Sequence, residues 1–285
     1  MNHVYIWPHF DAILVKIGPF AIHYYALAYI TALLLGWRLM RFTARETPAI
    51  ATATQVDDFL AWATLGVVVG GRIGYIIFYQ PVYFLHHLDR TYAVWDGGMS
   101  FHGGLLGVAV AIAIFTRRNG IDTLSFADRI AVPVPIGLFL GRIANFINGE
   151  LWGRPAPAWF PIRMIYPQSG SDVPRYPSEL IEATLEGIML FIVMITVSRR
   201  ENLRRHPGFI AGVFILGYGI ARTTAECFRQ PDWFLGYLIF GLTMGQILSI
   251  PMIFIGAGLM YYAWRRGPRI VASPLDTPPT ASRIA

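Results

Sequence analysis

Seven long apolar stretches constrain this sequence more than any other feature. A helix that crosses a membrane needs about 20 mostly apolar residues. Charged residues make up 14% of the 285 positions, whereas soluble domains carry about a quarter. We therefore predict an all-α integral membrane protein with about seven transmembrane helices. The predicted spans are residues 19–41, 59–79, 100–116, 128–148, 179–198, 208–227 and 240–264.

The distribution of basic residues predicts the orientation of these helices. Fourteen of the 23 Lys and Arg residues fall in one set of loops and flanks, and six fall in the other. Since basic loops remain cytoplasmic, we predict a periplasmic N-terminus and a cytoplasmic C-terminus, which agrees with an odd number of spans. The net charge of +6 follows from this arrangement and does not indicate a nucleic-acid partner.

Composition outside the spans predicts the domain organisation. Residues 1–266 are expected to form one polytopic membrane domain. Within it, the polar and proline-rich stretch 149–178 forms a periplasmic insert. Residues 267–285 are expected to form a disordered cytoplasmic tail. The N-terminus lacks a basic leader followed by an apolar run, so we expect no cleaved signal peptide.

Two local patterns concern the spans themselves. Pro133 and Pro135 are expected to kink or to begin the fourth span. Small residues at every fourth position allow helices to approach closely in lipid. We therefore predict helix-packing sites at Gly66, Gly70, Gly74, Gly137 and Gly141.

The stretch GRIANFINGELWGR, residues 141–154, carries an unusual number of polar groups for the end of an apolar span. An arginine at the bilayer centre costs roughly 2.5–3.5 kcal/mol. On a helix Arg142 and Asn145 share a face, and Asn148 lies beside Asn145. Arginine presents a planar fork of donors that suits carboxylate or phosphate. The pattern indicates an oxyanion cradle at the level of lipid headgroups.

Three further polar motifs fall on the same predicted side of the membrane. They are WDGGMSFHGGLLG (95–107) with His102, IHYYALAY (22–29) with Tyr25, and ECFRQPD (226–232) with Arg229. Each has a structural alternative. His102 can be a hydrogen-bonded structural residue, and Tyr25 can belong to an interfacial aromatic belt. Arg222 and Glu226, four residues apart, can simply pair on one helix face.

Cysteine and metal chemistry are limited by composition. Cys227 is the single cysteine, so neither an intramolecular disulfide nor a cysteine metal site can form. The sequence shows no cluster of metal ligands. We expect no metal and no cofactor.

The motifs resemble those of the bacterial prolipoprotein diacylglyceryl transferases. GRIANFINGELWGR carries most of the resemblance, which extends from about residue 20 to 265. It implies a multi-pass enzyme of the bacterial inner membrane that moves the diacylglyceryl group of phosphatidylglycerol to the thiol of the lipobox cysteine in a prolipoprotein. A thioether forms and glycerol phosphate leaves. The other matching motifs are GGRIGYIIFY (70–79), WDGGMSFHGGL (95–105), FRQPD (228–232) and MGQILSIPM (244–252).

The resemblance also implies residue roles. The catalytic set is Tyr25, His102, Arg142 and Arg229; the headgroup-binding set is Arg142, Asn145, Glu150, Gly153 and Arg229; Asn148 and Glu226 support them. The sequence departs from the family pattern at Ala26, at Ala144 and in YPSELIEATLEG (176–187), where Tyr176, Glu179 and Ile181 differ, so we assign no catalytic role to that segment.

The chemistry of the implied reaction refines these roles. The nucleophile is the thiol of the substrate, so Cys227 is expected to be a buried bystander. A free thiol has a pKa near 8.5, and a base must favour the thiolate. His102 is the candidate base because histidine changes charge near neutral pH; Tyr25 and Glu150 are alternatives. Arg142 and Arg229 would hold the phosphate and stabilise its growing charge.

Two other functions use similar residues. A transporter or flippase for an anionic lipid would need the same arginines, but such proteins often contain internal repeats, and no clear repeat relates the two halves of this sequence. An intramembrane protease would need an embedded nucleophile motif such as GxSxG, and the sequence has none. A lipid–thiol transfer assay separates the transferase from both.

Overall fold

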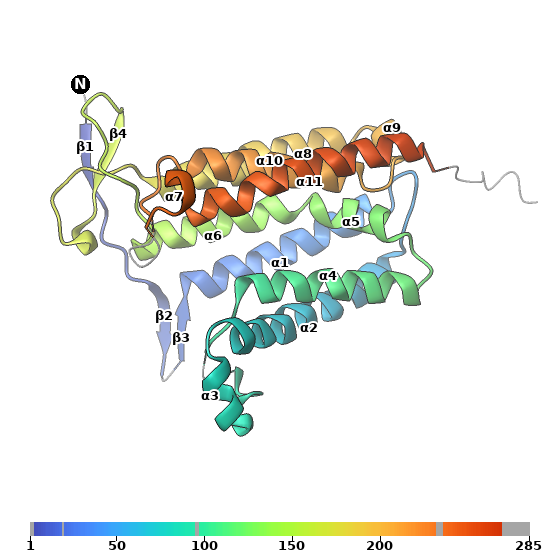
Figure 1. Ribbon diagram of the computed structural model, residues 1–285, viewed down its shortest axis with the longest axis horizontal. Helices are drawn as coiled ribbons and strands as arrows, with labels where there is room; N and C mark the ends of the chain where they lie inside the picture. Colours follow the sequence, from blue (N-terminus) through green and yellow to red (C-terminus); the bar gives the residue numbers. More distant parts are fainter. Residues whose placement is uncertain (1–2, 19, 95–96, 232–235, 270–285) are drawn as a thin grey trace, which may run out of the picture.

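The computed structural model describes residues 3–18, 20–94, 97–231 and 236–269. Long helices lie side by side in a bundle, with two pairs of short strands at one end (Figure 1). The elements in chain order are β1 (His3–Ile6), β2 (Ile13–Ile17), β3 (Phe20–His23), α1 (Tyr24–Thr43), α2 (Ala53–Phe78), α3 (Pro81–His86), η1 (Leu88–Arg90), α4 (Phe101–Arg118), α5 (Thr123–Ala131), α6 (Val134–Asn148), β4 (Ile162–Ile165), η3 (Pro167–Ser169), α7 (Ser178–Glu182), η4 (Ala183–Met189), α8 (Leu190–Ser198), α9 (Glu201–Arg204), α10 (Phe209–Ala225), η5 (Ile239–Gly241) and α11 (Met244–Arg266).

Each of the seven predicted apolar stretches is helical over most of its length. Within the described residues, four helices are long and apolar enough to cross a membrane, and Phe209–Ala225 is a shorter apolar helix. The molecule is therefore mostly helical and has the helices of a membrane protein, as predicted. The four long helices are Ala53–Phe78, Thr123–Asn148, Ser178–Ser198 and Met244–Arg266.

Local sequence signals explain where several helices begin. Thr52 starts α2 with a capping box, in which its hydroxyl accepts from the Gln55 N–H and the Gln55 side chain accepts from the Thr52 N–H. Such reciprocal bonds satisfy the free donors of a helix start. Pro133 separates α5 from α6 and stands as the cap of α6. The fourth predicted span is thus broken at Pro133, and α6 begins at the next residue, in agreement with the prediction that the prolines kink or begin it.

Glycines bring α2 and α4 into close contact, as predicted. A Cβ on Gly66 would lie 2.8 Å from the Gly107 carbonyl oxygen, and a Cβ on Gly74 would lie 2.7 Å from the Gly103 Cα. No side chain fits between these backbones. For Gly141 the prediction is wrong, because no heavy atom lies within 4 Å of the position of its Cβ.

The prediction of an all-α protein is corrected by two small sheets. β2 pairs antiparallel with β3, and β1 pairs parallel with β4, which lies about 160 residues away in the chain. Trp7 follows β1, is 2% exposed and donates from its indole nitrogen to the Phe146 carbonyl oxygen over 2.8 Å. The N-terminal segment is thereby fixed to both the 149–178 stretch and the end of α6.

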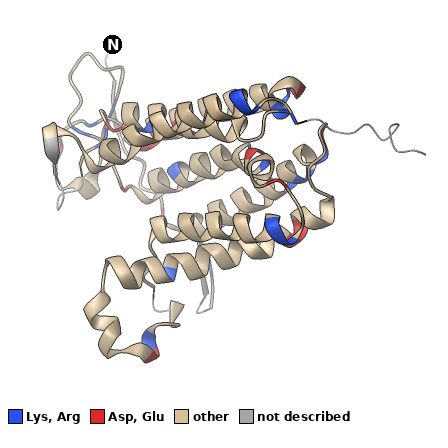
Figure 2. Ribbon diagram, turned by 45° about the vertical axis from the view of Figure 1, so that its right-hand side comes forward, with Lys and Arg blue, Asp and Glu red and all other residues tan. Residues whose placement is uncertain are grey.

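The bundle is built from pairs of packed helices. α2 packs on α4, α1 on α6, and α10 on α11. In Figure 1, α1 and α6 lie between the α2–α4 pair and the α8, α10 and α11 group. Blue segments gather at the end of the bundle opposite the β1–β4 pair (Figure 2). The polar end of α6 therefore faces the strands, far from this basic end.

Some predictions fall on positions outside the described residues. They are Trp95 and Asp96 of the second polar motif, Asp232 of the fourth, and residues 270–285 of the predicted disordered tail 267–285.

Candidate functional site

The end of α6 brings four of the predicted site residues together. The helix stops at Gly149, which adopts a left-handed conformation with φ of 63°, and the chain turns so that the Glu150 N–H bonds the Asn145 carbonyl oxygen at 3.2 Å. The Asn145 amide then donates to the Tyr25 hydroxyl at 2.5 Å and to Glu150 Oε1 at 2.9 Å. Asn148 donates to the same Glu150 oxygen at 3.4 Å. Asn145 is thus the junction between α1, α6 and Glu150.

Arg142 precedes Asn145 by about one turn of α6, and only part of its guanidinium group makes a short contact. Its Nε lies 2.7 Å from Glu182 Oε2. Its two terminal nitrogens make contacts of 3.5 Å, one with Asn145 Oδ1 and one with Glu186 Oε2. The side chain is 18% exposed. Hydrogen bonds of 3.5 Å are long and weak, so the outer edge of the guanidinium can still donate strongly to an anion.

Arg222 of α10 forms the second ion-pair centre. Its Nη1 lies 2.7 Å from Glu182 Oε2 and 3.3 Å from Glu186 Oε1, and its Nη2 pairs with Glu226. The other Glu226 oxygen accepts from Thr243 at 2.8 Å. The alternative in which Arg222 and Glu226 pair with each other is therefore what the structure contains.

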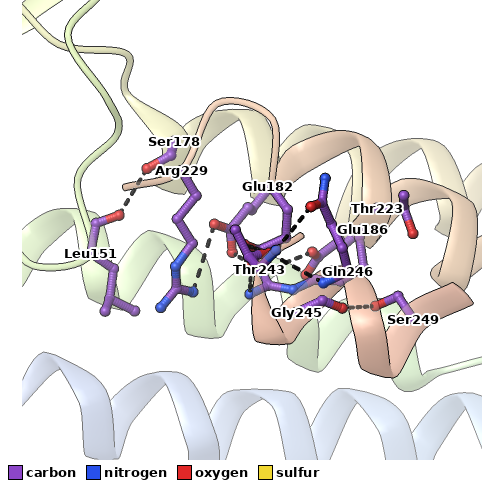
Figure 3. A network of polar contacts seen from close by, with 12 residues as sticks. Leu151, Ser178, Glu182, Glu186, Thr223, Arg229, Thr243, Gly245, Gln246 and Ser249 are labelled. Atoms are coloured by element: carbon purple, nitrogen blue, oxygen red, sulfur yellow. Dashed lines mark hydrogen bonds and ion pairs between the residues drawn. The ribbon is translucent and has the colours of Figure 1, made fainter. Parts of the chain in front are cut away.

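Arg229 approaches the same centre from the loop after α10. Its Nη1 lies 3.9 Å from Glu182 Oε1, and Figure 3 shows its side chain directed at Glu182. Arg154 binds the backbone of this segment. Its Nε donates to the Arg229 carbonyl oxygen at 2.8 Å, and its Nη2 donates to the Glu226 carbonyl oxygen at 3.1 Å. Arg142, Arg222 and Arg229 thus meet around one carboxylate.

Gly153 permits this loop arrangement. It forms a bridge with Arg229. A Cβ there would lie 2.5 Å from the Tyr176 carbonyl oxygen and 2.6 Å from that of Phe228. The structure therefore accounts for glycine by close backbone packing. Contact between Gly153 and a headgroup remains a prediction.

Glu182 and Glu186 carry no predicted site role, yet they lie at this centre. Both are buried, with Glu182 1% exposed. Removing charges from water is expensive unless they are paired, and these carboxylates offset the charge of Arg142 and Arg222. The signal was present in the sequence: two glutamates four residues apart, on one helix face, in an apolar segment require cationic partners.

Glu179 belongs to a separate contact. It is buried and its Oε2 accepts from the Tyr166 hydroxyl at 3.0 Å. Burial, and then the neighbouring Glu179 carboxylate, raises the pKa of Tyr166. Tyr166 therefore stays a hydrogen-bond donor, and this pair stabilises the contact of the 149–178 stretch with α7.

His102 is placed differently from the other candidates. It is exposed at the second position of α4, on the α2–α4 pair, whereas the arginine–carboxylate centre lies on α6, α7, η4 and α10. The structure brings Tyr25, Arg142, Asn145, Glu150 and Arg229 into one region but does not place His102 on those elements.

Cys227 is exposed, so the expectation that it is buried is wrong. It follows the end of α10, where its sulfur lies 3.8 Å from Gln246 Nε2. Among the residues that the structure describes, no three His, Cys, Asp or Glu side chains come together in a way that could hold a metal ion.

Arg72 lies within the predicted span 59–79 and has a structural role. It is buried in α2 and donates to the carbonyl oxygens of Arg90 and Thr91 at 2.6 and 2.9 Å, and to that of Gly97 at 2.6 Å. These bonds order the loop before α4 and satisfy the buried charge. Arg72 therefore stabilises this loop and is not part of the Arg142 centre.

Apolar helices that enclose arginines, carboxylates and an Asn–Tyr pair define a helical membrane protein with a polar centre suited to an anionic group. The sequence matches the family described as prolipoprotein diacylglyceryl transferase over residues 12–262. The chain belongs to this family.

Relatives named phosphatidylglycerol–prolipoprotein diacylglyceryl transferase cover nearly the whole chain. The protein of Acidiphilium cryptum is 78% identical over 92% of this chain and 95% of its own length. The protein of Gluconacetobacter diazotrophicus is 60% identical over 98% of this chain and 100% of its own length. That of Paramagnetospirillum magneticum is 51% identical over 94% and 98%, respectively.

Proposed function

We propose that this chain is an enzyme that transfers the diacylglyceryl group of phosphatidylglycerol to the cysteine thiol in the lipobox of a prolipoprotein signal peptide. Membership of the family and relatives of that name support the reaction. We place the chain in the bacterial inner membrane as a multi-pass protein with seven spans. Its N-terminus and residues 149–178 are periplasmic and its C-terminus is cytoplasmic, in keeping with the arginine distribution.

The reaction requires one bond to form and one to break. The substrate thiolate attacks the glycerol carbon that carries the headgroup phosphate. A carbon–sulfur bond forms as the carbon–oxygen bond to phosphate breaks, and glycerol phosphate leaves with the bonding electron pair. Negative charge grows on the departing phosphate, so fixed cationic donors near it lower the barrier.

The observation that carries this proposal is the partly engaged guanidinium of Arg142. Glu182 fixes its Nε at 2.7 Å, while its terminal nitrogens make contacts of 3.5 Å and remain able to donate. Arginine binds phosphate through two parallel hydrogen bonds. Arg142 would hold the phosphate of the lipid, and Arg229, from the loop after α10, would stabilise the negative charge of that phosphate. Glu182 orients both arginines.

The remaining groups have positioning roles in this proposal. Asn145 and Asn148, joined through Glu150, would orient the glycerol headgroup by hydrogen bonds. Tyr25 accepts from Asn145, three residues after Arg142 in α6, because α1 packs on α6. His102 remains the candidate base for the thiol, with Tyr25 and Glu150 as alternatives.

A direct assay tests the proposed reaction. Purified protein in detergent is mixed with phosphatidylglycerol and a lipobox peptide, and the peptide mass and glycerol phosphate release are followed. We expect a diacylglyceryl mass gain for the natural protein and none for Arg142→Ala. A folded protein that forms no thioether in this assay, but moves phosphatidylglycerol between leaflets after reconstitution into vesicles, would instead be a flippase.

A further inference from the structure

Two adjoining cavities lie at the end of α1 that is remote from the strands. The first, of about 650 Å³, lies between α1, α6, η4 and α8. The second, of about 610 Å³, lies around the last turns of α1. Arg38 and Phe42 line both. Both volumes fall within the roughly 300–1,000 Å³ of cavities that bind small ligands.

The first cavity is apolar and the second is basic. Apart from Arg38, the first is lined by apolar side chains and Gly187. The second is lined by Trp37, Phe42, Arg38, Arg41, Arg45 and Glu46. Arg38 and Arg41 are three residues apart on α1, and Arg45 lies in the turn that follows the helix. An apolar groove that opens into a basic pocket has the chemistry of a lipid tail joined to an anionic headgroup.

The partners of these arginines leave two of them available. Arg41 lies 3.4 Å from Asp57 and stacks over Trp37. Glu46 lies 3.4 Å from Arg204, so it does not neutralise the pocket. Within the part of the chain that the structure describes, the guanidinium groups of Arg38 and Arg45 make no hydrogen bond or ion pair. Both are exposed and can donate to a phosphate.

We propose that this pair of cavities binds one anionic phospholipid of the leaflet that faces the end of α1, which is cytoplasmic in the proposed topology. Arg38 and Arg45 hold its phosphate, and one acyl chain lies in the apolar groove. Basic pockets between transmembrane helices on the cytoplasmic side recognise such headgroups. The proposal rests on the proposed membrane orientation and not on the transfer reaction.

The site is separate from the Arg142 centre but touches the same helices. Phe139, which lines the groove, stands three residues before Arg142, and Gly187 directly follows Glu186. Three residues of helix span about 4.5 Å. The bound lipid would therefore pack against the segments that carry Arg142 and Glu186, while its headgroup lies at the opposite end of the groove.

Photocrosslinking tests the proposal on the purified protein in detergent. The probe is phosphatidic acid with a diazirine in one acyl chain, and phosphatidylcholine with the same chain is the comparison. We expect adducts on peptides that carry residues 35–42 and 187–192. We expect about tenfold less adduct with phosphatidylcholine, and about tenfold less with the double variant Arg38→Gln, Arg45→Gln, since each basic residue contributes to anionic lipid binding.

Two control variants distinguish a lipid bound in this pair of cavities from a lipid bound at the Arg142 centre. Arg117→Gln removes an exposed charge from the end of α4, at the same end of the bundle, and should leave the adducts unchanged. Arg142→Ala should also leave them unchanged. Equal labelling by both probes in the natural protein, or no adduct on these peptides, would overturn the proposal. The proposal would also be overturned if the adducts disappeared in Arg142→Ala but persisted in the double variant. The groove would then hold the tail of a lipid whose headgroup is bound at Arg142.

Discussion

Single side chains connect segments that are distant in sequence. Glu182 contacts Arg142 and Arg222, each at 2.7 Å, and Arg229 at 3.9 Å. Arg142, Asn145 and Glu150 were predictable because one short motif carries them. Glu182 was not assigned, because its partners lie about 40 residues away on either side and its own segment departs from the family pattern. Pairing of buried charges is a property of the fold rather than of a motif.

Asn145→Asp tests the junction at the end of α6. The change removes both hydrogen bonds that the amide donates, to Tyr25 and to Glu150, and places two carboxyl groups side by side. We expect the free energy of unfolding to fall by roughly 1–3 kcal/mol, the cost of unsatisfied buried groups. Thermal unfolding in detergent measures it. Asn148→Asp is the matched control, because Asn148 makes a weaker contact of 3.4 Å with Glu150; equal effects of the two changes would contradict the role given to Asn145.

At the scale of helices and strands, apolar stretches were the reliable signal. Their length and composition predicted where the helices lie, and Pro133 predicted the break between α5 and α6. The strands were not predicted. β1 and β4 have four residues each and pair across about 160 positions, so no periodic pattern is long enough to reveal them. Their pairing depends on Trp7 and the end of α6 being brought together by the bundle.

The α2–α4 contact supports a prediction about helix packing. Gly107→Ala should lower the free energy of unfolding by about 1–3 kcal/mol, as overpacking does, because the new Cβ would lie 2.9 Å from the Gly70 Cα. Gly104→Ala on the same helix should be neutral or slightly stabilising, since its nearest neighbour lies at 3.6 Å and alanine favours helix. Denaturation of the two variants in detergent measures the difference. A Gly104 variant as unstable as the Gly107 variant would refute close packing as the cause.

At the scale of the whole molecule, the bundle has two chemically different ends. The strands lie at one end, and Lys and Arg segments gather at the other (Figure 2). The end of α6 that carries the Arg142 centre contacts the N-terminal strand segment through Trp7, whereas the basic cavity surrounds the last turns of α1. The proposed reaction joins a lipid to a peptide. A polar centre on apolar helices, near the end that the 149–178 stretch covers, allows both substrates to remain at the membrane surface.

Cysteine labelling in cells tests the orientation of the two ends. In a Cys227→Ser background, Asp172→Cys places a thiol in the 149–178 stretch and Asn202→Cys places one at the opposite end, both at exposed positions. A maleimide that cannot cross the inner membrane should modify position 172 in intact cells and position 202 only after lysis. The reverse pattern would invert the proposed topology, and labelling of both in intact cells would exclude it.

In the proposed reaction, the planar fork of Arg142 holds the departing phosphate. The most direct test compares the initial rate of diacylglyceryl transfer by Arg142→Lys with that of the natural protein, with thermal unfolding measured on the same samples. Lysine keeps the charge but loses the two-pronged geometry. We predict that the rate is lower by about 10²–10³-fold, which is the loss typical of a removed oxyanion donor, and that most of the protein is still folded. A rate within a few-fold of that of the natural protein, or a loss of rate that only follows the unfolded fraction, would contradict this role of Arg142.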